Sequence, residues 1–246
     1  MTPPILSAHG LSKSFRGLHA LSGVDFAVAR GSITSIIGPN GAGKTTLFNV
    51  IAGAQAPSGG EVRFGERVIS GLPPEAICRM GIARTYQTVR PFGGLSVWDN
   101  VRVALLYGRR EPPPPGEADG EIVRALASAH LTVNAARKAE SLTPLERKRL
   151  EIARALATAP ELLLLDEIVA GLGPAEAGDM METIRALNGG GVTILLIEHV
   201  MKAVMGLSGH IIVLHHGEKI AEGAPEAIAR DEQVLRAYLG EAAEEA

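Results

Sequence analysis

The sequence predicts an α/β protein built on a parallel sheet, with an antiparallel β part at its N-terminus and an inserted helical part. The parallel sheet rests on two runs, "ELLLLDE" at 161–167 and "VTILLIEH" at 192–199, which are apolar without alternation and flank a helical segment. Such strands are typical of a parallel sheet covered by helices on both faces. The antiparallel part rests on short alternating or β-branched runs, broken by glycine, in the first third of the chain.

Taken in order, the β-rich part holds the runs "ILSAHGLSKSF" at 5–15 and "VDFAVARGSITSIIG" at 24–38. The run "GEVRFGERVIS" at 60–70 predicts a hairpin that turns near Gly65 and Glu66. From about Pro73 the pattern becomes helical, over residues 72–80, 96–108, 116–131 and 145–159.

The remaining segments are a loop and a helix. "EPPPPG" at 111–116 cannot continue a helix and predicts a stiff exposed loop, with a polyproline II ligand for a partner as the less favoured alternative. "GPAEAGDMMETIRALNGGG" at 173–191 predicts a helix that stops at glycine. No internal repeat and no heptad pattern is present in the sequence.

Composition excludes several classes of protein. The chain has 246 residues, 46% hydrophobic residues and a formal net charge of -3, which fits one large or two small globular domains and not a disordered or nucleic-acid-coating protein. Its one cysteine, Cys78, excludes an internal disulfide and fits a reducing compartment. The N-terminus does not resemble a signal peptide, and the longest apolar runs are strand-sized. We therefore expect any membrane role to act through partner chains.

"GPNGAGKTT" matches the P-loop pattern G-x-x-x-x-G-K-[ST], between a predicted strand, "SITSII", and a predicted helix, "KTTLFNVIAG". Backbone amides of 40–45 would cradle phosphates, Lys44 would reach the β- and γ-phosphates, and Thr45 would ligate Mg²⁺. The alternative is a glycine-rich turn that binds nothing. It is disfavoured because a predicted strand leads into this loop and a predicted helix leads out of it. The predicted phosphate-binding residues are Gly38, Pro39, Asn40, Gly41, Ala42, Gly43, Lys44, Thr45 and Thr46.

Three further residues supply chemistry to a phosphate site. Asp166 follows the buried strand at 161–167 and can hold Mg²⁺, and Glu167 beside it is either a general base or an ordinary solvated carboxylate; we favour the base. His199 ends its apolar strand, where it either bonds a γ-phosphate or is a polar terminus, and spacing leaves both open. His215 and His216 end a later strand and are predicted surface residues.

"SLTPLERKRLEIARAL" at 141–156 predicts an amphipathic helix with a capping box. Thr143, Pro144 and Glu146 occupy the N-cap, first and third positions, so Thr143 and Glu146 can cap the helix reciprocally. A helix N-terminus can also hold an anion. From this segment alone, self-capping is favoured over phosphate binding.

The motif order resembles the ATPase subunits of ABC transporters over nearly the whole chain. The P-loop is followed by "RTYQ" ending in Gln87, a helical stretch, "LTPLERKRLEIARAL", "LLLLDE", "GLGP" and "IEH". Stretches 79–92, 195–208 and 234–240 are similar to importers of branched-chain amino acids and related amides or urea. The resemblance implies a single nucleotide-binding domain over 1–246 with a P-loop (RecA-like) core, and a helical subdomain over about 89–158.

The resemblance also implies roles and partners. Phe15 matches the residue that stacks on adenine, and Gln87 matches the glutamine that links Mg²⁺ and water to the membrane partner. Asp166, Glu167 and His199 match the metal carboxylate, the general base and the switch histidine. The implied ligands are ATP and Mg²⁺. The implied partners are transmembrane permease subunits, a second ATPase subunit and, indirectly, a periplasmic solute-binding protein, at the cytoplasmic face of the bacterial inner membrane.

The signature departs from the family pattern. L-S-G-G-Q becomes L-T-P-L-E at 142–146, so Thr143 keeps the hydroxyl that would face the ATP of the opposite chain, whereas Pro144 has no N–H to donate. Gly173 stands where an aspartate is common. We therefore expect a non-identical ATPase partner, with a homodimer as the alternative. Lipid or lipopolysaccharide export is the nearest alternative function. A nucleic-acid ATPase is disfavoured, because no coiled coil, cysteine pair or basic stripe is present.

Overall fold

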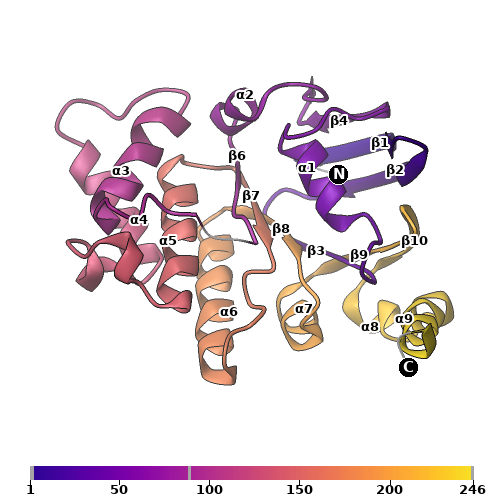
Figure 1. The fold of residues 1–246 in the computed structure, drawn as a ribbon. Helices are drawn as coiled ribbons and strands as arrows, with labels where there is room; N and C mark the ends of the chain where they lie inside the picture. The colour runs from indigo at the N-terminus through magenta and orange to yellow at the C-terminus, as the bar shows by residue number, and fades with distance from the viewer. Residues whose placement is uncertain (1–2, 88–89, 245–246) are drawn as a thin grey trace. The chain divides into compact units, whose positions relative to one another are not determined.

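The computed structural model describes residues 3–87 and 90–244 of the chain, without the side chains of 239–244 (Figure 1). The chain divides into two compact units. The first unit combines residues 1–74 with 193–246, and the second comprises residues 75–192.

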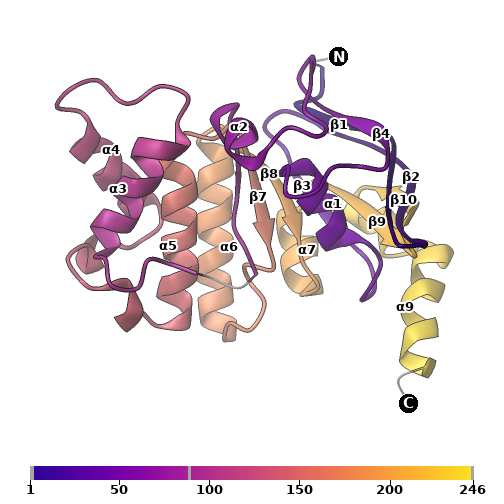
Figure 2. The same cartoon turned by 45° about the horizontal axis from the view of Figure 1, so that its top comes forward.

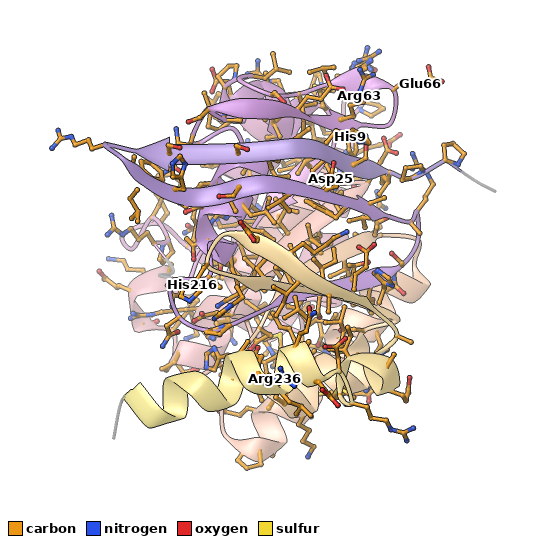
Figure 3. The ribbon with its side chains drawn as sticks, turned by 90° about the vertical axis from the view of Figure 1, so that its right-hand side faces the viewer. His9, Asp25, Arg63, Glu66, His216 and Arg236 are labelled. Atoms are coloured by element: carbon orange, nitrogen blue, oxygen red, sulfur yellow. The ribbon has the colours of Figure 1, made fainter. Side chains whose placement is uncertain are left out.

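The first unit contains an antiparallel sheet in the order β2-β1-β4-β5. Its strands are β1 Leu6–Phe15, β2 Leu18–Val28, β4 Gly59–Phe64 and β5 Arg67–Val68. Phe64 pairs with Arg67, so the predicted hairpin turn at Gly65 and Glu66 is confirmed. Figure 3 shows His9 and Asp25 on neighbouring strands of this sheet, with Arg63 and Glu66 near the hairpin. The predicted antiparallel N-terminal part is therefore confirmed.

The same unit contains the first part of the predicted parallel sheet. The central strand, β3 Ile33–Ile37, pairs in parallel with β8 Thr193–Ile197 and with β9 His210–His215. All five residues of β8 are buried, as its apolar sequence predicts, and all five of β3 are buried too, including the polar Thr34 and Ser35. β10 Glu218–Gly223 pairs antiparallel with β9 at the edge.

Helices complete this unit: α1 Lys44–Ile51, α7 Met201–Leu207, α8 Pro225–Ile228 and α9 Glu232–Glu244. Ile37 on β3, Val213 on β9, Val204 on α7 and Val234 on α9 belong to one buried cluster. Figure 2 shows α9 descending from the end of the sheet that holds β9 and β10. Burial of these apolar side chains fixes β3, and with it the start of α1, in place.

The second unit is mainly helical. It contains α2 Pro74–Arg79, α3 Val97–Gly108, α4 Ala118–Ser128, α5 Pro144–Ala157 and α6 Pro174–Gly189, with short 3₁₀ turns at Thr132–Asn134 and Ala139–Ser141. Helices α3, α4 and α5 pack against one another and bury Leu105, Leu126 and Leu150 (Figures 1 and 2). The predicted loop at 111–116 lies between α3 and α4. Val89, the predicted start of the helical subdomain, lies outside the described residues.

One strand of this unit was not predicted. The helical pattern that begins near Pro73 left residues 81–95 unassigned, and β6 Ile82–Arg84 is a strand that pairs in parallel with β7 Leu162–Asp166. Gly81 ends the preceding helix with a φ of 106°, and its carbonyl accepts the N–H of Leu162. Three residues are too few to show a period, so only the pairing with β7 reveals this strand.

No helix among the residues that the structure describes is long and apolar enough to cross a membrane.

Candidate active site

The glycine-rich loop joins β3 to α1, as the strand–loop–helix context predicts. Gly38, Gly41 and Gly43 all have a positive φ, at 150°, 76° and 101°. A Cβ on Gly38 would overlap the carbonyl oxygen of Leu214, and a Cβ on Gly43 would lie 2.5 Å from that of Ala20. Neighbouring backbone therefore approaches the loop too closely for a side chain at either position.

The N-terminus of α1 is open. Its N-cap, Gly43, makes no side-chain cap, and no acidic residue lies in its first turn. Lys44 Nζ donates to the carbonyl oxygens of Gly38 at 2.6 Å and Pro39 at 2.7 Å, and Thr45 is exposed. The helix N-terminus and the ammonium together place positive charge at this loop, which suits an anionic phosphate.

Phe15 lies in the same unit as the P-loop. It ends β1, pairs with Leu18 and is 40% exposed, with Lys13 Nζ 4.9 Å from its ring centroid. Ala20, two residues beyond Leu18, is the residue whose carbonyl approaches Gly43. An exposed aromatic ring therefore sits on the hairpin that packs against the P-loop, where an adenine could stack.

In the second unit, three predicted residues come together. Asp166 ends β7, is buried, and accepts a hydrogen bond from Arg84 Nη2 at 2.9 Å. Glu167 Oε2 accepts from Gln87 Nε2 at 2.6 Å, although Gln87 is exposed. Arg84 was not among the predicted site residues, because its contact with Asp166 depends on the pairing of β6 with β7, in which Arg84 lies opposite Leu164.

His199 differs slightly from its prediction. Strand β8 ends at Ile197, so His199 lies two residues beyond the strand and does not end it. Its side chain is exposed, and its backbone N–H donates to Oε2 of the buried Glu198 at 3.3 Å. Its strand, β8, pairs in parallel with the P-loop strand β3. His215 is half-buried and His216 is exposed, and their rings contact each other.

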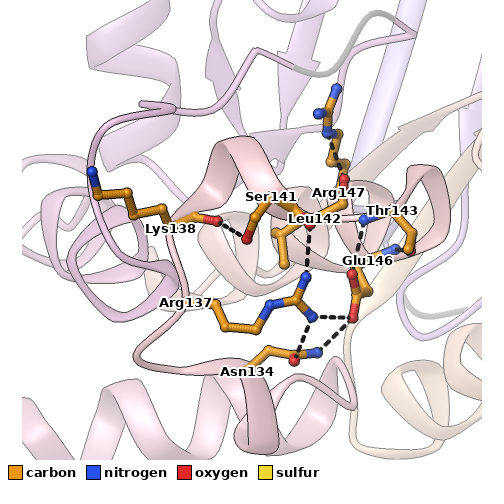
Figure 4. Close-up of polar contacts among 8 residues, drawn as sticks. All are labelled: Asn134, Arg137, Lys138, Ser141, Leu142, Thr143, Glu146 and Arg147. Atoms are coloured by element: carbon orange, nitrogen blue, oxygen red, sulfur yellow. Dashed lines mark hydrogen bonds and ion pairs between the residues drawn. The ribbon is translucent and has the colours of Figure 1, made fainter.

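The capping box at the start of α5 is confirmed (Figure 4). Glu146 Oε2 accepts from Thr143 N at 2.8 Å, and Thr143 Oγ1 accepts from Glu146 N at 3.3 Å. Glu146 Oε1 accepts from Arg137 and Asn134, each at 2.9 Å. The backbone hydrogen bond from Thr143 holds the pKa of Glu146 below its usual range, with Arg137 contributing. This helix start is occupied by a carboxylate of its own.

The donor set fits Mg²⁺. The predicted metal-binding residues, Thr45, Gln87 and Asp166, offer hydroxyl, amide and carboxylate oxygens, and Mg²⁺ prefers oxygen ligands. Among the described residues there is no group of three His, Cys, Asp or Glu side chains that could hold a metal ion alone. This composition matches the usual Mg²⁺ site in phosphate enzymes, where one or two carboxylates act together with substrate phosphates.

Comparison with known proteins decides the family. The ABC transporter family model matches residues 21–170, a span that includes the P-loop, the start of α5 and Asp166. This chain belongs to the ABC transporter family. It is an ATP-binding cassette of that family, and its chemistry is ATP hydrolysis. A second model, described as the branched-chain amino acid ATP-binding cassette transporter, matches residues 218–244 of the cassette.

Relatives and solved structures agree with this assignment. The high-affinity branched-chain amino acid transport ATP-binding protein LivG of Salmonella typhimurium is 43% identical, over 98% of this chain and 100% of its own length. The structure of a nucleotide-free ATP-binding cassette from an ABC transporter superposes with a TM-score of 0.87 at 32% identity, covering 96% of this chain and 98% of that one. The structure of a dimeric bacterial ABC transporter cassette superposes with a TM-score of 0.80 at 25% identity, covering 89% of this chain and 98% of that one. The predicted α/β fold is thereby confirmed.

Proposed function

We propose that this cassette is the ATPase subunit of an importer for branched-chain amino acids or related small polar solutes. The observation that carries the proposal is similarity to LivG over the full length of both chains. The match of residues 218–244 to the branched-chain amino acid cassette model supports it independently, because that segment contains neither the P-loop nor Asp166. The same match favours this importer over lipid or lipopolysaccharide export.

In this proposal the first unit binds the nucleotide. Phe15 stacks on adenine, and the loop from Gly38 to Thr46 surrounds the phosphates with backbone N–H groups. Lys44, which donates to the carbonyl oxygens of Gly38 and Pro39 in this structure, turns toward the β- and γ-phosphates of the bound nucleotide. His199 forms a hydrogen bond with the γ-phosphate. Charge neutralisation by these groups stabilises the transferring phosphoryl group.

The second unit supplies the water chemistry. Glu167 accepts the proton of the attacking water, and Gln87, which already donates to Glu167, orients that water. Mg²⁺, when bound through Thr45, Asp166 and Gln87, neutralises charge that develops on the phosphates. Release of Asp166 from Arg84 frees the carboxylate oxygen for this role.

The second ATPase subunit in the proposal is a different chain. In ABC cassettes that pair head to tail, the start of α5 faces the nucleotide of the partner through Thr143. Here Pro144 has no N–H, the N–H of Glu146 is used by Thr143, and the Glu146 carboxylate adds negative charge. The nucleotide site that this helix completes is therefore the weaker of two. The partner would provide an intact signature for this chain's own P-loop.

The remaining partners follow from the importer. Permease subunits in the membrane receive the closing and opening of the ATPase pair, and a periplasmic solute-binding protein delivers the solute to them. The cassette itself would lie at the cytoplasmic face of the bacterial inner membrane. Nucleic acid has no part in this proposal.

The test is purification of the tagged chain from membranes in mild detergent, with mass-spectrometric identification of what accompanies it. We expect two permeases, a second ATPase and ATP hydrolysis stimulated by solute and binding protein. Glu167→Gln should reduce that hydrolysis to a small residual rate, whereas the control Glu182→Gln, on the exposed face of α6, should not. Recovery with nucleic acid and no membrane partner, or with a lipid-export permease, would contradict the proposal.

A further inference from the structure

The residue after Asp166 has an unusual backbone. Glu167 adopts a φ of 50°, in the left-handed region that residues with a Cβ seldom occupy. A conformation of this kind persists only where surrounding contacts impose it. Helix α5 supplies contacts that hold the backbone at this position.

Lys148 on α5 holds the backbone around Glu167. Its Nζ donates to the carbonyl oxygens of Glu167 at 2.9 Å, Ile168 at 3.0 Å and Ala170 at 2.7 Å. An ammonium has three N–H donors, and three carbonyls of one short segment accept from it. Lys148 therefore gathers the segment that follows β7 around a single charge.

Glu151, one turn further along α5, holds the other side of the same site. It is 7% exposed, and its Oε2 accepts the N–H of Tyr86 at 3.2 Å while its Oε1 bonds Arg154 Nη1 at 3.0 Å. Tyr86 immediately precedes Gln87. Lys148 and Glu151 are three residues apart, so they lie on one face of the helix.

The contact between Gln87 and Glu167 closes a ring. Lys148 holds the backbone of Glu167, Glu167 accepts from Gln87 at 2.6 Å, and Glu151 holds the residue before Gln87. We propose that Lys148 and Glu151 are positioning residues, which fix the general base Glu167 and the water-orienting Gln87 against helix α5. This inference rests on the proposed roles of Glu167 and Gln87 in ATP hydrolysis.

The first test is Lys148→Met in the transporter purified with its partner subunits. We expect kcat to fall about 10- to 100-fold, because displacement of a catalytic group by about 1 Å can cost that much, with KM for ATP within about twofold. Lys148→Arg, which keeps a cation with several donors, should recover most of kcat. The control is Lys138→Met, an exposed lysine of the same unit.

Two substitutions of Glu151, the second proposed positioning residue, test the inference without changing Lys148. Glu151→Leu removes the acceptor for Tyr86 N–H and should lower kcat about tenfold, whereas Glu151→Gln keeps an acceptor and should stay near wild type. Equal loss in both variants, or unchanged kcat in Glu151→Leu, would overturn the role of Glu151.

A double mutant separates positioning from general structure. If Lys148 acts through Glu167, adding Lys148→Met to Glu167→Gln should change the residual rate by less than about twofold. A loss that multiplies with that of Glu167→Gln, or an unchanged kcat in Lys148→Met alone, would overturn the inference. Unchanged hydrolysis in Glu167→Gln would instead refute the proposed general base, so the two failures are distinguishable.

Discussion

Two helix N-termini in this chain differ in whether their backbone N–H groups are capped by the chain's own side chains. Helix α1 begins at a glycine without a side-chain cap, has no acid in its first turn and presents Lys44. Helix α5 begins with a threonine cap, a proline and Glu146, whose carboxylate accepts from Thr143, Arg137 and Asn134. Both helix ends carry partial positive charge. The first leaves that charge for a ligand, and the second neutralises it within the chain.

The difference concerns function more than stability. A capped helix start is stabilised by about 1 kcal/mol, and α1 forgoes that contribution. An uncapped start costs stability but keeps N–H groups available for phosphate. In the pair of ATPase chains that we propose, an open P-loop and a self-capped signature helix would make the two nucleotide sites unequal.

The largest expected effect comes from removing the cation at the open helix start. Lys44→Ala should lower ATP hydrolysis by the assembled transporter more than about 100-fold, since the ammonium stabilises charge that develops on the phosphates. Nucleotide affinity should fall as well. Steady-state kinetics and titration with a fluorescent ATP analogue measure both effects, with Lys138→Ala as the control. Activity within tenfold of wild type would remove Lys44 from the site.

The next effect tests how tightly the open loop is held. Gly38→Ala should lower the free energy of unfolding by about 2–4 kcal/mol, because its Cβ would overlap the carbonyl oxygen of Leu214. Gly41 also has a positive φ, but a Cβ there meets nothing within 4 Å. Gly41→Ala should therefore cost only about 1 kcal/mol. Urea unfolding compares the two variants, and equal costs would contradict the close approach.

The smallest expected effects concern Glu146 and Glu151 of α5, whose contributions to the free energy of unfolding change with pH in opposite directions. Hydrogen bonding by Thr143 N–H lowers the pKa of Glu146, so its stabilisation is present above 4.5, the usual value, and is lost as pH falls through its folded pKa. Burial raises the pKa of Glu151, so its contribution to stability is present below pH 4.5 and is lost as pH rises through its folded pKa.

The corresponding variants are Glu146→Gln and Glu151→Gln. Stability relative to wild type should fall for Glu146→Gln by about 1 kcal/mol at neutral pH, and this difference should vanish in acid. For Glu151→Gln the relative stability should rise as pH increases above 4.5. Urea midpoints across pH 3–8 measure both, and parallel slopes would contradict the contrast between the two carboxylates.

Features set by local sequence were predictable. The P-loop needs glycines and a lysine at fixed spacing, and the capping box needs Thr143 and Glu146 three residues apart, so a pattern suffices for both. The hairpin at Gly65 is local in the same sense. His199 was misplaced by two residues relative to its strand, which is the usual uncertainty of an element boundary.

Features set by packing between distant segments were not predictable. Arg84 meets Asp166 only because β6 pairs with β7, and three residues carry no period. Lys148 and Glu151 belong to the predicted amphipathic helix, whose pattern does not say what its charged residues contact, and the fold turns them toward Glu167 and Tyr86. Only the tertiary arrangement distinguishes such residues from surface charges.

The most direct test of the unequal helix starts is the mass of the isolated Glu167→Gln chain in MgATP, measured by analytical ultracentrifugation. We predict a monomer, because the start of α5 would hold the nucleotide of a second copy too weakly to keep two copies of this chain together. Replacing Pro144, Leu145 and Glu146 with glycine, glycine and glutamine in that background should produce an ATP-dependent dimer. A stable ATP-bound homodimer of the chain with its own "LTPLE" sequence would contradict the account.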